Sequence, residues 1–385
     1  MTGARHNTRL DALRGVAALT VAAFHVGQTQ VQTPEGLRML TLSADAGRGV
    51  LSVLASAYDW LLNGFGAVAL FFVLSGYVLR LSLDRMAGSG TGIAAAFMSR
   101  RALRLFPPLF FMVAALAILD VISGHRLPAA VPANYTPLGL LQSALLLDSR
   151  INGVTWTLQV EAFAAPTILI LWFAQKRWGS GVLWASAFIL GAMTFSGEFD
   201  RWFNRNLSFP IDFWMNIYAF VAGMLVVEWR QIAVRSGVTR MGGLYPLMCA
   251  LMIVAAPQVL GFTSPFRRIV EVLGAAGLIT GIVLGLEGWV TRVLDLNIVR
   301  FYGRISYSFY LLHPLTLAIL WTDRPYVDEL VSSGVPAFVV AFMALVVTTA
   351  IVTPLALLSH VLVERPFIAL GKRAVRSVEA HGSLP

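Results

Sequence analysis

Apolar residues occur along this chain in long runs, separated by short polar or basic segments. Ten of these runs approach the roughly 20 residues that an α-helix needs to cross the hydrocarbon core of a bilayer. They predict helices at about 10–27, 62–82, 104–123, 154–174, 181–196, 209–228, 244–261, 269–288, 305–322 and 336–362, of which 181–196 is the shortest. The pattern therefore predicts an all-α fold, a polytopic transmembrane helical bundle.

The basic residues orient the predicted spans, because Lys and Arg concentrate in cytoplasmic loops. If the N-terminus is cytoplasmic and the spans alternate, 20 of the 29 Lys and Arg residues fall on the cytoplasmic side. An even number of spans then leaves both termini in the cytoplasm. We expect a multi-pass protein of the inner (plasma) membrane, with a membrane domain over residues 1–370 and a short cytoplasmic tail over 371–385.

Composition supports a membrane protein and narrows its chemistry. The chain is 57% hydrophobic and 13% charged, whereas soluble domains carry about 25% charged residues. The net charge of +9 is interpreted as a topology signal and as contact with anionic membrane lipids, and no nucleic-acid motif accompanies it. The single cysteine, Cys249, excludes an intramolecular disulfide and a thiolate metal cluster. We expect no metal and no tightly bound cofactor.

Two predicted outer loops, Gln28–Leu61 and Gly124–Gly153, are long. Within the first, the apolar segment Val50–Leu62 is typical of a short amphipathic helix. Two placements fit this segment, one along the membrane interface and one re-entering the bundle.

The first span contains two ionisable residues eleven positions apart. Arg14 lies near its start and His25 deep inside it. Eleven residues make roughly three helical turns, so the two share one face about 16 Å apart along the axis. Ionisable groups in a membrane helix are costly and rarely face lipid. The pair therefore predicts a polar path that leads from the cytoplasmic side into the bundle.

Further polar residues lie on the second, third and fourth spans. Arg101 and Arg104 share one helix face and suit either a membrane anchor or a clamp for phosphate groups. Glu161 is predicted at nearly the depth of His25, where its carboxylate would either fix the imidazole tautomer or tie helices together. Ser75 either lines a site or hydrogen-bonds its own helix.

The ninth span carries Ser306, Tyr310 and His313 near one face, and structural and chemical roles for His313 are equally open. Pro314 would kink this helix and free the carbonyl group of Tyr310. After the last span, Glu364 either pairs with an arginine of the phosphate clamp or merely ends the helix.

Six motifs, taken in order, resemble those of the acyltransferase-3 family of integral-membrane O-acyltransferases. They extend over residues 10–366: Leu10–Gly15 with His25, Phe71–Tyr77, Arg100–Pro107, Thr155–Glu161, Gly303–His313, and Glu364 with Pro366. The resemblance implies transfer of an acyl group, usually acetyl, from cytoplasmic acyl-CoA as co-substrate to a hydroxyl of a sugar or glycoconjugate, as in polysaccharide modification. It also implies functional roles for five residues: Arg14 with His25, Arg101 with Arg104, and Glu161.

We therefore expect three groups of site residues: catalytic His25 and Glu161, CoA-binding Arg14, Arg101 and Arg104, and substrate-binding Ser75, Tyr310 and His313. His25 would act as general base or as a transient acyl carrier. A transporter or flippase of a lipid-linked glycan or small molecule is the alternative, because buried charges and proline-broken helices suit it too. A weaker alternative is a non-catalytic partner in polysaccharide assembly. The acceptor, acyl length and oligomeric state stay open.

Overall fold

The computed structural model describes residues 7–27, 30–33, 36–39, 49–122, 124, 135–149, 151–196, 213–261, 263–320, 329–330 and 332–381. Of the basic residues that oriented the spans, Arg5, Arg48, Arg126, Arg150, Arg201, Arg205 and Arg324 lie outside this part, as do residues 382–385 of the predicted tail.

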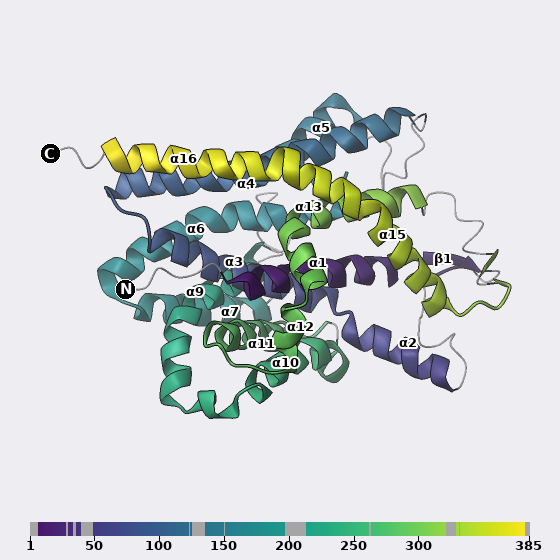
Figure 1. The fold of residues 1–385 in the computed structure, drawn as a ribbon, viewed down its shortest axis with the longest axis horizontal. Coiled ribbons are helices and arrows are strands. Elements are labelled where there is room, and N and C mark those ends of the chain that lie inside the picture. Colours follow the sequence, from purple (N-terminus) through teal and green to yellow (C-terminus); the bar gives the residue numbers. More distant parts are fainter. Residues whose placement is uncertain are drawn as a thin grey trace.

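Helices make up nearly all of the described chain (Figure 1). The α-helices are α1 (Thr8–Gly27), α2 (Val50–Leu61), α3 (Gly64–Leu83), α4 (Gly90–Ile122), α5 (Pro137–Ala144), α6 (Trp156–Trp178), α7 (Gly181–Ser196), α9 (Phe213–Arg235), α10 (Leu244–Leu260), α11 (Pro265–Val283), α12 (Trp289–Leu294), α13 (Asn297–Leu320), α15 (Ala337–Ser359) and α16 (Arg365–His381). Short 3₁₀ turns, η3 (Gly153–Thr155) and η4 (Val238–Met241), and a π-helix, η5 (His360–Glu364), join them.

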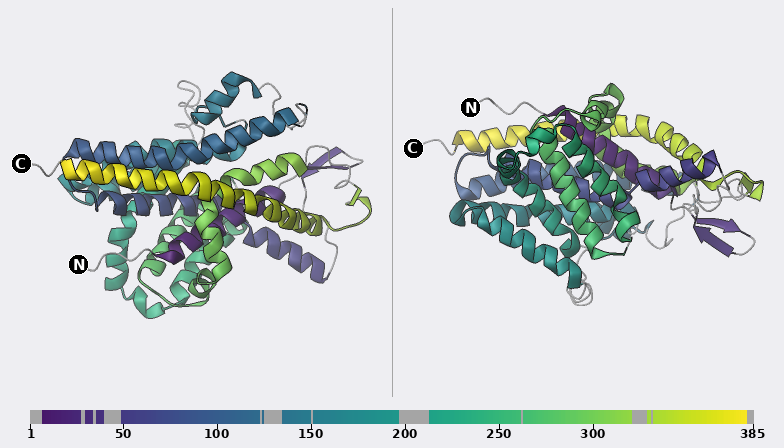
Figure 2. Two further views of the ribbon diagram at one scale, coloured as in Figure 1. Left: turned by 45° about the horizontal axis from the view of Figure 1, so that its top comes forward. Right: turned by 90° about the horizontal axis from the view of Figure 1, so that it is seen from below.

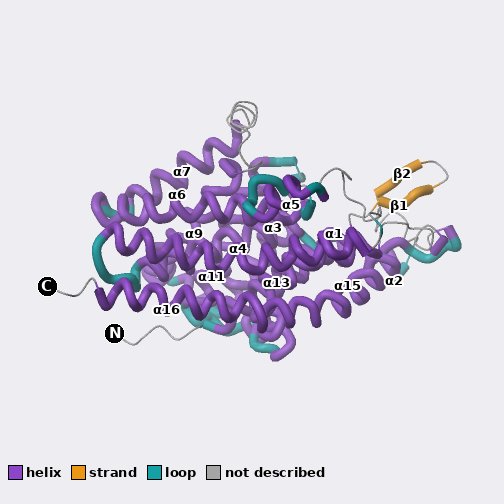
Figure 3. The backbone as a smooth tube through the Cα atoms, turned by 90° about the horizontal axis from the view of Figure 1, so that it is seen from above, coloured by secondary structure: helices purple, strands orange, loops and turns teal. Residues whose placement is uncertain are grey.

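One β-hairpin accompanies the helices in the described residues. Strand β1 (Gln30–Thr33) pairs antiparallel with β2 (Gly36–Met39), so that Gln30 lies opposite Met39. The hairpin stands near α2, at one end of the bundle (Figure 3). The predicted apolar helix in this loop is confirmed as α2, which lies at the periphery of the bundle, where the Tyr58 hydroxyl donates to the Ala23 carbonyl at 3.4 Å.

Each of the ten predicted segments contains a helix. Six helical stretches are long and apolar enough to cross a membrane, namely Thr8–Gly27, Gly64–Leu83, Gly90–Ile122, Gly153–Trp178, Asn216–Arg235 and Phe338–Arg373. Two more, Gly181–Phe195 and Leu244–Leu260, are apolar but shorter. The described chain has the helices of a polytopic membrane protein, and ten spans with cytoplasmic termini stay a prediction.

Two helices extend well beyond the predicted segments. Helix α4 begins at Gly90 rather than near residue 104, so Arg101 lies inside a helix of 33 residues. Helix α15 continues through η5 into α16, which lies along α4 (Figures 1 and 2). Hydropathy does not predict these extensions, because it reports only the apolar part of a helix.

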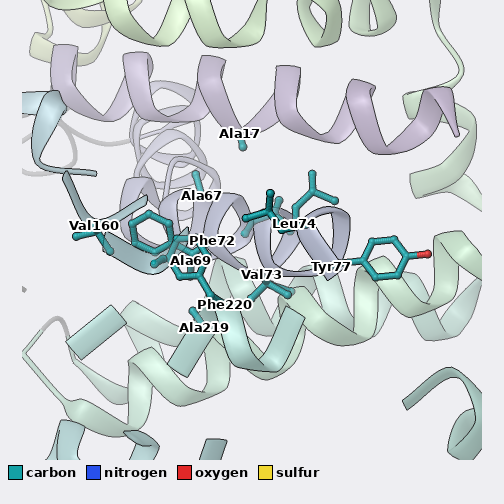
Figure 4. Close-up of a cluster of buried hydrophobic side chains, with 14 of the residues drawn as sticks. Ala17, Ala67, Ala69, Phe72, Val73, Leu74, Tyr77, Val160, Ala219 and Phe220 are labelled. Carbon is teal, nitrogen blue, oxygen red and sulfur yellow. The ribbon is translucent and has the colours of Figure 1, made fainter. Parts of the chain in front are cut away.

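The centre of the bundle is closely packed. Helix α1 packs on α13, where a Cβ atom on Gly15 or on Gly303 would collide with the backbone of the other helix. The glycines therefore let these two helices approach more closely than any larger residue allows. Beside them, Ala17 of α1 and Phe72 of α3 belong to a buried apolar cluster in which Phe72 stacks on Phe220 of α9, with ring centroids 4.8 Å apart (Figure 4).

A cluster of charges fixes the beginning of α1 to the segments that flank α12. The Arg9 guanidinium donates to Glu287 at 2.7 Å and to Asp295 at 2.5 Å. Arg300 also donates to Asp295. Hydrogen bonds from Arg9 hold the pKa values of both carboxyl groups below their usual range.

Candidate functional site

A part-buried ion pair joins three helices. Nη2 of Arg101 on α4 donates to Oε1 of Glu161 on α6 at 2.5 Å, and the hydroxyl of Ser75 on α3 donates to the same oxygen at 2.7 Å. Arg101 is only 6% exposed. A buried charge is tolerated when a partner of opposite charge compensates it, so each of these two residues requires the other.

A cavity lies beside this ion pair. It is lined by polar groups and by an apolar wall from α1, α3, α4, α6 and α13: Arg14, Val68, Phe71, Phe72, Ser75, Arg104, Thr157, Leu158, Glu161, Ser306, Tyr307 and Tyr310. Arg14 and Arg104 line it, whereas Arg101 does not. In the described residues, Arg104 has no carboxylate partner, and Arg14 has a long contact to Asp11 at 3.3 Å.

The polar groups of the cavity lie at different positions along its length. Tyr310 of α13 and Thr157 of α6 are joined at one end by a 2.9 Å hydrogen bond between their hydroxyl groups. Glu161 follows Thr157 by four residues, which places it about 6 Å further along α6. The charged groups and the Tyr310 hydroxyl therefore occupy different levels of the same cavity.

Beyond Tyr310 lies a pair of histidines. Nδ1 of His25 on α1 and Nε2 of His313 on α13 are 2.9 Å apart, with nearly parallel rings, and His313 is fully buried. The ring centroids of His313 and Tyr310 are 5.7 Å apart. The ring centroids of Tyr310 and Phe71, which is in the cavity wall, are 5.6 Å apart. The histidine pair is thus connected to the cavity through the aromatic ring of Tyr310.

Pro314 determines how this pair shares its protons. Proline has no N–H group, so the carbonyl of Tyr310, four residues earlier, loses its helical donor. Nδ1 of His313 lies 2.7 Å from this carbonyl oxygen. A carbonyl only accepts, so the proton of neutral His313 is on Nδ1 and its Nε2 is an acceptor. Nδ1 of His25 must then donate, which places the lone pair of neutral His25 on Nε2.

The structure brings most of the predicted site residues together, but in two groups. Arg14, Arg104, Ser75, Glu161 and Tyr310 line one cavity, Arg101 is bonded to its edge, and His25 pairs with His313.

Of the two roles that the sequence left open for Glu161, the link between helices is found, because its carboxylate joins α6 to α3 and α4, whereas the contact with His25 is not. In the described chain, Ser75 and Arg101 are the hydrogen-bond partners of the Glu161 carboxylate, and His313 occupies the place next to His25. Glu161 and His25 also lie at different levels of the bundle, because Glu161 lies about 6 Å along α6 from Thr157 and the histidine pair lies beyond Tyr310. Counting residues from the ends of predicted spans gives neither the offset between two helices nor the rotation of each helix, and these decide the side-chain partners.

Neither role that the sequence left open for Glu364 is found, because it does not pair with an arginine of the cavity and the helix continues past it into α16. Within η5, Oε2 of Glu364 accepts from Ser308 at 3.0 Å and contacts Nδ1 of His360 at 3.1 Å. Thr157 was not predicted as a site residue, although it contacts Tyr310. The sequence could have indicated Thr157, because it lies four residues before Glu161 and therefore on the same helix face.

Comparison with known proteins gives a family. The model of the Acyl_transf_3 family, an acyltransferase domain, matches residues 7–357. Nodulation protein 10 of Rhizobium leguminosarum bv. viciae is 27% identical over 200 residues, which cover 46% of this chain and 52% of that protein. The chain thus spans about half the length of this relative. No solved structure matches it.

The family match extends over nearly the whole chain and includes all the helices that surround the cavity and the histidine pair. It favours an enzyme over the transporter and the non-catalytic partner that the sequence left open. This chain belongs to the acyltransferase-3 family.

Proposed function

We propose that this enzyme transfers an acyl group, acetyl in the first instance, from cytoplasmic acyl-CoA to a hydroxyl of a sugar or glycoconjugate. The observation that carries the proposal is a cavity with Arg14 and Arg104 in its wall and a pair of hydrogen-bonded histidines next to Tyr310, at the end away from Glu161.

The phosphate groups of CoA would be held by Arg14 and Arg104. A guanidinium group binds phosphate through two parallel hydrogen bonds, and both of these side chains line the cavity. Arg101 has a different role in this proposal, because its charge is compensated by Glu161. It positions the carboxylate and Ser75 in the cavity wall.

The transfer itself would use His25 as general base. Nε2 of His25 removes the proton of the acceptor hydroxyl while the oxygen attacks the thioester carbonyl carbon. The C–S bond then breaks, and the thiolate takes the proton back from Nε2 and leaves as free CoA. His313 holds Nδ1 of His25 throughout, so that the lone pair faces away from His313. Tyr310, held by Thr157, would position the acceptor.

The first test measures free thiol released from acetyl-CoA by purified enzyme with an oligosaccharide acceptor. General-base help contributes about 10²–10⁴-fold, so His25→Ala should lower the rate by that factor. His360→Ala, a histidine in η5 away from the cavity, is the matched control and should retain activity. Normal turnover by His25→Ala at equal expression would contradict the proposal.

Steady-state kinetics separate the two possible roles of His25. A base acts in a complex that contains both substrates, which gives intersecting double-reciprocal plots. An acyl-imidazole would form before the acceptor binds, which gives parallel plots and exchange of labelled CoA without acceptor. We expect intersecting plots.

A further inference from the structure

A second groove lies away from the acyl-transfer cavity, between α3, α9 and α11. Its lining combines a polar group of residues, Tyr77, Arg230, Gln231 and Arg235, with an aliphatic wall, Leu81, Val226, Val227, Val234 and Val283. No aspartate or glutamate contributes to it. The groove is open, because Arg230, Gln231, Val234 and Arg235 are all exposed.

The two arginines of this groove differ from the other arginines on the same helices. On α3, buried Arg80 is bonded to Glu228 of α9 through two hydrogen bonds, at 2.6 and 2.7 Å, so the charge of Arg80 is compensated. Arg230 and Arg235 have no carboxylate partner among the described residues. The groove therefore carries an uncompensated positive charge.

Tyr77 adds a hydrogen-bond donor at the same place. Its hydroxyl points away from the apolar cluster that contains its ring (Figure 4) and lies within electrostatic range of Arg85 and Arg230. Within the described structure it has no hydrogen-bond partner. Two guanidinium groups, a phenolic hydroxyl and an amide side chain are together suited to a phosphate group.

The aliphatic wall indicates what the phosphate is attached to. A phosphate ester whose other parts are all polar would leave this wall uncovered, whereas Leu81, Val227, Val234 and Val283 line the same groove as the arginines. An acyl chain laid along them would remove apolar surface from water, and basic pockets between transmembrane helices are suited to anionic head groups.

We propose that this groove binds an anionic phospholipid, with its phosphate at Arg230, Arg235 and Tyr77 and an acyl chain along the valines. The site is separate from the acyl-transfer cavity, so the proposal does not depend on the proposed function.

The test is lipid binding to the purified full-length protein in detergent, measured by native mass spectrometry with phosphatidylglycerol and phosphatidylcholine as probes. Each basic residue near the membrane surface contributes about 1 kcal/mol to binding of anionic lipid, so Arg230→Gln with Arg235→Gln should weaken phosphatidylglycerol binding about 30-fold. Tyr77→Phe removes only the proposed hydrogen bond to the phosphate and should weaken phosphatidylglycerol binding about fivefold. Phosphatidylcholine binding should change little in either variant.

The matched control is Arg177→Gln with Arg292→Gln, which removes the same charge from two exposed arginines outside the groove. Phosphatidylglycerol binding should be retained in this variant. The proposal is overturned if the control weakens binding as much as the groove variant, or if the wild-type protein does not prefer phosphatidylglycerol. Displacement of the lipid by soluble glycerophosphoglycerol at equal concentration would assign the groove to a free phosphate ester instead.

Discussion

Replacing His313 by phenylalanine keeps an aromatic ring beside His25 but removes the acceptor for its Nδ1–H group. In the structure this hydrogen bond is 2.9 Å long and His313 is fully buried, so water does not readily take its place. A buried donor left without a partner costs about 1–3 kcal/mol. The His25 ring avoids this cost by moving its proton to Nε2, and it then has no lone pair for the acceptor hydroxyl.

The expected loss follows from these numbers. At 1.36 kcal/mol for each tenfold change in rate, turnover by His313→Phe should fall about 5- to 150-fold. The KM for acyl-CoA should stay the same, because His313 does not line the cavity where CoA would bind. The ¹⁵N NMR signals of labelled His25 should show a protonated Nδ1 in the wild-type enzyme and a protonated Nε2 in the variant.

The matched control is His360→Phe, which replaces the histidine of η5 and should leave both kcat and the His25 signals unchanged. A His313→Phe enzyme with wild-type turnover would refute the proton-sharing argument. So would a variant in which kcat falls while the protonated nitrogen of His25 stays the same.

Two further predictions concern charged residues. Arg104→Ala should raise the KM for acetyl-CoA at least tenfold with little loss of stability. Arg101→Ala should destabilise the protein by about 1–3 kcal/mol, because the Glu161 carboxylate loses its charged partner and keeps only Ser75. Initial rates and thermal unfolding distinguish the two variants. Arg9 lowers the pKa of Asp295, so this contact stabilises the fold above the unfolded pKa of about 4 and is lost as pH falls through the lower folded pKa. Thermal midpoints of the wild type should therefore drop more steeply than those of Arg9→Ala between pH 5 and 2, and equal slopes would contradict this assignment.

The helices could largely be predicted from hydropathy, because a membrane span must be both apolar and long. The extension of α4 to Gly90 and the whole of α16 were not predicted. Both are amphipathic or polar segments whose helical conformation depends on packing against each other. Their sequences show no long apolar run, so a method based on apolar length stops too early.

The site could be predicted in part. The sequence correctly indicated that Pro314 frees the Tyr310 carbonyl, because this effect is local to one helix. The pairing of His25 with His313 joins residues 288 positions apart and depends on how α1 and α13 rotate as they pack. No local pattern gives that rotation, and the same reason explains why Glu161 was assigned the wrong partner.

The packing of α16 along α4 has a consequence for handling the protein. Gly371 lies against Arg100 of α4, one residue before the ion-paired Arg101. A deletion that removes α16 as a dispensable polar tail would therefore uncover the helix that carries Arg101 and Arg104. Affinity tags and fluorescent fusions belong after His381, and an inactive C-terminal truncation would report a disturbed arginine helix rather than a missing regulatory segment.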